Sequence, residues 1–278
     1  MAKLALGSLP ATRRTRPRGR QRGGAERAET EGPILSPVIR HPLQEQAYHK
    51  LREALMSGDF MPGQSITLRA TANVMGTSPM PVRDALRRLE IEHALVAKSN
   101  RTLGVPEMTY TSLIELRDVR VALEGLAAEK AAAYITPAEI ANVDRWYRDL
   151  ERAAKAGNHN DYMHANWSFH SEIYRASRSQ LLVSLIEPTW MRIGPYVRHM
   201  LPDRKSLIVS LDNHLDALRA LERRDSAAAR NAIAQDIIDS AEGLARSLQA
   251  RSAGGAAAGG RAAKTKPRGR AKRSSSRR

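Results

Sequence analysis

The chain has 278 residues, which is room for two domains, and it contains no cysteine, which excludes disulfides and thiolate metal sites. No apolar run approaches the length of a membrane span, and no apolar segment follows the basic N-terminal stretch. We therefore expect neither a membrane anchor nor a secretory signal. The net charge is +16, but residues 44–250 hold 26 basic and 26 acidic side chains, so the excess lies entirely in the two ends.

The first segment, residues 1–43, is rich in arginine, glycine and proline and has too little apolar surface to fold alone. It holds nine Lys/Arg and three Glu. This composition predicts a disordered basic arm that attracts DNA phosphates without regard to sequence. A solubilising leader or a misassigned start codon would explain the same composition.

Residues 44–107 have the pattern of a small DNA-binding domain. Gln44–Ser57 is amphipathic and predicts an opening helix. Leu68–Met75 predicts a short helix that ends at Gly76, because glycine adopts the left-handed conformation of a helix end at little steric cost. A longer helix follows, and then Ala94–Lys98 and Thr102–Pro106 flank a polar tip as the strands of a small β-hairpin do.

The longer helix should begin at Ser78, whose hydroxyl can cap the first turn, and Pro79 fits the first helical position. Apolar residues at helical spacing predict its buried face: Val82, Leu86 and Leu89. The other faces carry three arginines that we expect to be free: Arg83, Arg87 and Arg88. A helix-turn-helix followed by a hairpin is a winged helix, whose second helix fits the major groove of DNA.

The run PGQSITLRATANVMGTSPMPVRDALRRLEIEHALV resembles the DNA-binding domain of the GntR superfamily of bacterial transcription factors. The resemblance rests on Pro62-Gly63, Gly76, Pro81-Val82-Arg83 and Ala85–Leu89, and residues 44–60 resemble the family's opening helix. A double-stranded DNA operator is the implied partner. Helix-turn-helix proteins usually read paired half-sites, so we expect a homodimer.

The family usually starts its recognition helix with Ser-Arg-Thr-Pro-Val-Arg, whereas this chain has SPMPVR at residues 78–83. The change removes a guanine or phosphate contact and adds apolar surface that can meet a thymine methyl group. Relatives place a DNA-contacting arginine where this chain has Arg69. The expected DNA-binding residues are Arg69, Ser78, Pro79, Met80, Arg83 and, at the wing tip, Asn100 and Arg101. The operator should therefore differ from the usual family consensus.

From Thr109 onward the chain is a series of Ala/Leu-rich segments with helical spacing and no alternating strand pattern. We expect helices at Thr109–Tyr134, 136–156, His159–Ser177, Gln180–Met200, Lys205–Arg223 and Ser226–Leu248. These segments predict an all-α bundle of about six helices over residues 108–250. The fold class is therefore mainly α, with an N-terminal winged helix-turn-helix.

The segment HANWSFHSEIY, residues 164–174, is the richest in candidate ligands. Asn166 and His170 are four residues apart and share one helix face, which is a common geometry for two ligands of one metal ion. His214 lies on a later helix, and Asp236 lies on the last one.

Residues 109–250 resemble the FadR C-terminal (FCD) ligand-binding domain, which indicates the FadR subfamily. The similar segments are RVALEGLAAEKAA at 120–132, NWSFHSEIY at 166–174, HLDALRAL at 214–221 and AAARNAIAQD at 227–236. Metal-binding members generally offer Asp, His, His and His at positions that here hold Asn166, His170, His214 and Asp236. The resemblance implies a divalent ion, with zinc, nickel and manganese all suited to mixed nitrogen and oxygen ligands. A metal-free polar pocket or a hydrogen-bonded core is the alternative.

Arg120 lies where the first helix of the family's effector domain usually carries an arginine. It is expected to bind the carboxylate of an organic-acid effector. Glu124 follows four residues later, and an Arg120–Glu124 pair within the helix would explain the same two residues.

Residues 251–278 hold ten Lys/Arg and no acidic residue. A Gly/Ala-rich linker at Gly254–Gly260 precedes a basic tail, which we expect to be disordered and to raise non-specific DNA affinity. A spacer without a specific role is the alternative.

These features favour a cytoplasmic, nucleoid-associated transcription factor, not an enzyme, whose DNA affinity is modulated by a small organic acid bound at a metal site. A metal-dependent enzyme on a helical bundle is one alternative, although the four candidate ligands leave no obvious separate general base. A basic nucleoid protein that acts through its tails is another.

Overall fold

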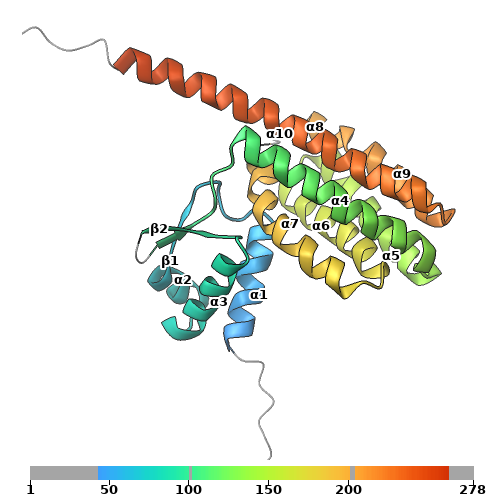
Figure 1. Ribbon diagram of the computed structural model, residues 1–278, viewed down its shortest axis with the longest axis horizontal. Coiled ribbons are helices and arrows are strands. Elements are labelled where there is room, and N and C mark those ends of the chain that lie inside the picture. Colours follow the sequence, from blue (N-terminus) through green and yellow to red (C-terminus); the bar gives the residue numbers. More distant parts are fainter. Residues whose placement is uncertain (1–42, 100–101, 201–203, 263–278) are drawn as a thin grey trace, which may run out of the picture. The chain divides into compact units, whose positions relative to one another are not determined.

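The computed structural model of the protein describes residues 43–99, 102–200 and 204–262 (Figure 1). The predicted arm up to residue 42, the wing-tip residues Asn100 and Arg101, and the tail beyond residue 262 lie outside the described residues. Within the described ranges the protein is mainly α, as predicted, with one small sheet near the N-terminal end. None of the described helices is long and apolar enough to cross a membrane.

The N-terminal part is a winged helix-turn-helix. Its elements are α1 (Leu43–Met56), β1 (Ser65–Thr67), α2 (Leu68–Met75), α3 (Pro79–Ile91), β2 (Val96–Ser99) and β3 (Thr102–Gly104). The strands form one antiparallel sheet in the order β1-β3-β2, in which Leu103 pairs with Ile66 on one side and Ala97 on the other. The sequence predicted only the hairpin, because a three-residue strand such as β1 is too short to show an alternating pattern.

The turn between α2 and α3 follows the predicted design with one exception. Gly76 ends α2 in the left-handed region, with φ 62°. Ser78 is the residue before α3, but its hydroxyl makes no capping hydrogen bond, so the predicted side-chain cap is wrong. Its extended backbone and the proline at position 79 start the helix instead. The predicted apolar face of α3 is buried.

Arg88 is engaged within the domain and is not free, contrary to the expectation from its spacing. Its Nε donates to Glu92 at 3.0 Å and its Nη1 to Glu45 at 3.3 Å, and the guanidinium lies 3.7 Å from the centre of the Tyr48 ring. The Tyr48 hydroxyl also donates to Glu92. The contacts with Glu45 and Tyr48 join α3 to α1, and spacing within α3 could not reveal them, whereas the Arg88–Glu92 pair has ordinary i,i+4 helical spacing.

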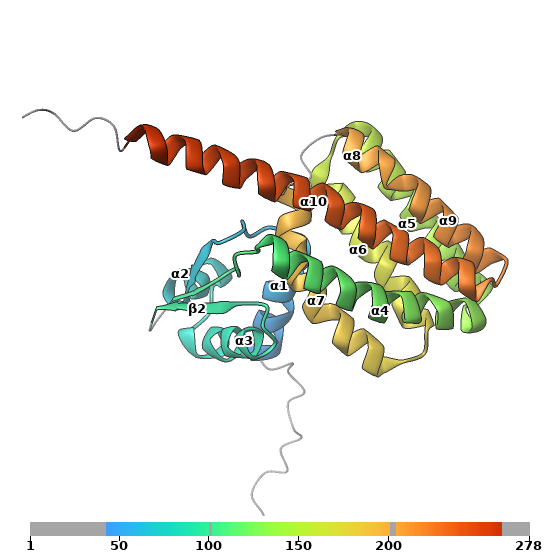
Figure 2. The ribbon, with the colours of Figure 1, turned by 45° about the horizontal axis from the view of Figure 1, so that its top comes forward.

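The C-terminal part is all-α in the residues that the structure describes. It consists of α4 (Tyr110–Tyr134), α5 (Pro137–Ala156), α6 (His159–Ala176), α7 (Gln180–Met200), α8 (Arg204–Val209), α9 (Leu211–Glu222) and α10 (Ser226–Ala262). Figures 1 and 2 show α10 running alongside α4 and α9. Pro188 and Pro195 both lie inside α7.

Polar caps fix where these helices begin. Thr109 and Ser112 form a reciprocal capping box at the start of α4, and Thr136 and Glu139 form another at the start of α5. Gly157 then ends α5 with φ 68°. These boundaries agree with the predicted ones.

Two boundaries differ from the prediction. The helix expected over Lys205–Arg223 is divided at Ser210, whose hydroxyl donates to the Leu207 carbonyl at 3.1 Å. Such side-chain bonds compete with the helical backbone pattern. In addition, α10 continues through the predicted linker Gly254–Gly260 to Ala262. The intrinsic propensities of this stretch do not explain the continuation, because four of its seven residues are glycine.

Candidate metal centre and DNA-reading surface

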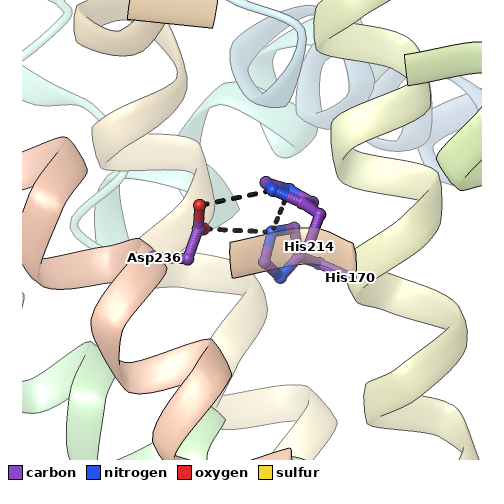
Figure 3. A group of neighbouring side chains, drawn as sticks. All are labelled: His170, His214 and Asp236. Carbon is purple, nitrogen blue, oxygen red and sulfur yellow. Dashed lines mark hydrogen bonds and ion pairs between the residues drawn. The ribbon is translucent and has the colours of Figure 1, made fainter. Parts of the chain in front are cut away.

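Three buried side chains from three helices meet in the C-terminal part: His170 of α6, His214 of α9 and Asp236 of α10 (Figure 3). The two Nε2 atoms of the histidines are 3.2 Å apart. Asp236 places Oδ2 3.4 Å from His170 Nε2 and Oδ1 3.4 Å from His214 Nδ1. Residues this close, each at most 9% exposed, form one potential coordination site.

Asn166 completes the set that the sequence singled out. It lies one turn before His170 on α6, is 7% exposed, and places its Oδ1 2.9 Å from His214 Nε2. The structure therefore brings all four predicted metal-site residues together, although they span 70 positions of the chain.

The protons of this cluster can be assigned in part from its surroundings. His214 Nδ1 lies 2.8 Å from the Ser210 carbonyl oxygen and Nε2 lies 2.9 Å from Asn166 Oδ1, and both oxygens can only accept. A ring proton on Nδ1 would bond to Ser210 and leave the electron pair of Nε2 facing the other candidate ligands, as a bound cation requires. Burial lowers the pKa of His214, so its ring is neutral near pH 7 and one of its two nitrogens keeps a free electron pair. Burial opposes ionisation of Asp236, but His214, His170 and Arg120 together hold its pKa below the ordinary value.

The centre is therefore rich in electron-pair donors and poor in protons. An imidazole nitrogen, an amide oxygen and a carboxylate converge on it, and these are the ligand types that divalent transition metals accept. This donor set fits a divalent cation, which His170, His214 and Asp236 would hold with Asn166 as a weaker neutral ligand.

A cavity of about 240 Å³ opens beside the cluster. Its lining includes Arg120, Tyr162, Asn166, Trp190, Asp236 and Arg246. Two of the four candidate ligands thus face a space that a small molecule could enter. The contributions of Trp190 and Arg246 to the lining were not predicted, because neither residue lies in a recognisable motif.

Arg120 pairs with Glu124 and also lines the cavity. Its Nε and Nη2 donate to the two carboxylate oxygens of Glu124 at 2.6 and 3.1 Å, so the intrahelical pair exists. The side chain also lines the cavity, and its Nη1 has no hydrogen-bond partner among the described residues. Its role toward an effector remains a prediction.

The winged helix carries a second candidate site, a concave surface between α2, α3 and the strands. Arg69, Arg83 and Arg87 line it together with Lys98. The three arginines are exposed and make no ion pair or hydrogen bond with the described residues. Ser78, Pro79 and Met80 are also exposed, and Met80 has 61% of its surface accessible. Arg87 was expected on a free face of the helix but was not among the expected DNA contacts.

Models of known protein families match both the N-terminal and the C-terminal part of the chain. The model of the bacterial regulatory proteins of the gntR family matches residues 43–105, and the FCD domain model matches residues 115–239. The chain belongs to the GntR family. Its pairing of a GntR helix-turn-helix with an FCD domain fits the FadR-like subfamily, as the sequence resemblance implied.

Known GntR proteins cover most of the chain. The HTH-type transcriptional regulator McbR of Escherichia coli is 28% identical over 68% of this chain and 87% of McbR, and the E. coli repressor RspR is 24% identical over 73% and 89%. The solved structure of E. coli McbR superposes with a TM-score of 0.70 over 76% of this chain and all of McbR, at 27% identity. These relatives are named as regulators of transcription, not as enzymes.

Proposed function

We propose that this GntR-family protein is a cytoplasmic transcriptional regulator that binds a DNA operator as a homodimer and changes its operator affinity when a small organic acid binds the FCD domain. One observation carries the proposal: the cluster of His170, His214 and Asp236 lies beside a cavity, and the same chain contains a winged helix.

The DNA-reading half of the proposal rests on α3. Its first turn exposes Pro79 and Met80, and Arg83 follows with an unpaired guanidinium. Residues at the start of a recognition helix lie nearest the bases in the major groove. Arg83 is therefore assigned to a base or phosphate contact, and Met80 to apolar contact with a thymine methyl group.

The ligand-binding half rests on the cluster and its cavity. A bound zinc, nickel or manganese ion would supply a positive charge that attracts a carboxylate of the effector. Arg120 can add a second contact through Nη1 without giving up Glu124. The cavity volume of about 240 Å³ suits a small acid better than a large ligand.

Selection of genomic DNA fragments by the purified full-length protein tests the DNA-binding proposal. We expect one or a few fragments with a repeated half-site, bound about a thousandfold or more tighter than random DNA at the same salt concentration. Equal affinity for all fragments would contradict a sequence-specific regulator and favour a protein that binds DNA through its basic ends.

A further inference from the structure

A hydrogen-bonded chain of buried side chains leads away from His170 on the side opposite the cluster. Tyr174 lies one turn later on α6, and its hydroxyl is 3.0 Å from His170 Nδ1. The same hydroxyl makes a short hydrogen bond to Glu124 Oε2. Glu124 is fully buried in α4 and also accepts from the Trp190 indole at 3.2 Å and from Arg120.

The direction of each bond follows from the charges. Glu124 is paired side-on with Arg120, so it is a carboxylate and can only accept. A tyrosine phenol carries its single proton at neutral pH, because its ordinary pKa is about 10. The ionised carboxylate is the stronger and closer acceptor for that proton.

With its proton directed to Glu124, the Tyr174 oxygen can offer only an electron pair to His170. We infer that Glu124 and Tyr174 form a relay that holds the ring proton of His170 on Nδ1, so that Nε2 faces the cluster as a free ligand. Glu124 and Tyr174 are positioning residues in this arrangement, because neither reaches the centre itself.

This inference rests on the proposed metal site and explains how it can work with a neutral Asn166. The Tyr174 hydroxyl directs its proton to Glu124, and its oxygen accepts the Nδ1 proton of His170. This outer-sphere hydrogen bond makes the His170 imidazole a better electron donor at Nε2. For His214, the Ser210 carbonyl offers the corresponding acceptor to a proton on Nδ1. Both imidazoles are thus prepared to present Nε2 to one cation.

The first test compares zinc affinity, measured by competition with a chromophoric chelator, in the wild type, Tyr174→Phe and Tyr196→Phe. Tyr196 is a matched control: it is also buried in the helical half, but its hydroxyl bonds to Pro106 and Met108. Loss of an outer-sphere partner typically weakens metal affinity about 10- to 100-fold. We expect that loss in Tyr174→Phe and none in Tyr196→Phe.

The second test needs no metal. Long-range ¹H–¹⁵N correlation spectra of the histidine-labelled, metal-free protein report which ring nitrogen carries the proton, and His170→Gln assigns the signal. We expect His170 to be protonated on Nδ1 in the wild type and in Tyr196→Phe, and to lose this preference in Tyr174→Phe. A purely structural role for Tyr174 would not move the tautomer.

The outcomes separate the relay from the metal proposal. Zinc binding with equal affinity in the wild type and Tyr174→Phe, or a wild-type His170 protonated on Nε2, would overturn the relay. If the wild type shows the expected tautomer but binds no zinc, nickel or manganese, the relay stands and the metal part of the proposed function fails.

Discussion

The arginines of the winged helix differ in whether they have partners within the protein. Arg88 is engaged by Glu92, Glu45 and the Tyr48 ring, so it contributes to the packing of α1 on α3. Arg69, Arg83 and Arg87 have no partner in the part of the chain that the structure describes, and all three line the same concave surface. Unpaired guanidinium groups on one surface are available to DNA without first breaking an internal ion pair.

Replacing Arg83 by alanine should weaken binding to the selected operator by about 1–3 kcal/mol, as for a lost base or charged contact. The melting temperature should stay close to that of the wild type, because Arg83 supports no internal contact that the structure describes. Fluorescence anisotropy at fixed salt measures the effect, and Arg148→Ala, which removes an exposed arginine from α5, is the control for charge. Unchanged operator affinity would show that Arg83 does not read the site.

The metal-site residues make a second prediction at this scale. Asn166→Asp should tighten zinc binding, because a carboxylate replaces a neutral amide beside His214, and His170→Ala should abolish it. Metal content and the melting temperature before and after chelation measure both effects. An ion present at a hundred times its dissociation constant stabilises the folded state by about 2.7 kcal/mol. An Asn166→Asp variant that binds zinc no better than the wild type would exclude Asn166 from the coordination sphere.

Among the secondary-structure elements, those with strong local signals were predictable from sequence. The caps at Thr109, Thr136 and Gly157 fix helix boundaries through contacts within a few residues, so the sequence contains the whole signal. The division at Ser210 was not predictable. The Ser210 hydroxyl bonds to the nearby Leu207 carbonyl and to Tyr162 of α6, and the second contact joins positions 48 residues apart.

The same distinction holds for the candidate site. The four metal-site residues were found from the resemblance to the FCD domain, and the structure brings them together. The bond between Tyr174 and Glu124 joins positions 50 residues apart, and no motif marks it. Spacing reveals residues that share one helix, whereas contacts between helices appear only when the fold is known.

Deprotonation of Tyr48 at alkaline pH should destabilise the packing of α1 on α3. Burial and the hydrogen bond to Glu92 raise the pKa of Tyr48 to about 12 from its ordinary value of 10.0. The folded state therefore holds this proton more tightly than the unfolded chain. The stabilisation is complete below pH 10 and is lost as the pH rises through about 12.

Tyr48→Phe should remove this part of the alkaline destabilisation. Urea denaturation at pH 9 and at several values above pH 10 would show a flatter loss of stability in the variant than in the wild type. Tyr110→Phe, which removes an exposed tyrosine hydroxyl, serves as the control. Identical slopes in Tyr48→Phe and the wild type would mean that Tyr48 does not hold its proton more tightly in the folded state.

At the level of the whole molecule, the excess positive charge and the helix expected to recognise the DNA sequence lie in different parts of the chain. Residues 44–250 are neutral overall, whereas residues 1–43 and 251–278 hold nine and ten basic side chains. Removing both ends should weaken binding to operator and random DNA by similar factors and reduce the dependence of affinity on salt concentration. The preference for operator over random DNA should survive. Loss of that preference on truncation would assign sequence reading to the ends and not to α3.

The central claim is that occupation of the FCD domain changes the affinity of the winged helix for DNA. Its most direct test is the dissociation constant of the operator complex for the wild type and His170→Ala, each with and without zinc and a panel of small organic acids. At least one acid should change the wild-type affinity by about 5- to 150-fold, the usual range of coupling between two sites. His170→Ala should bind the operator but lose that response. Operator affinity that no acid alters, or a response that His170→Ala retains in full, would contradict the account.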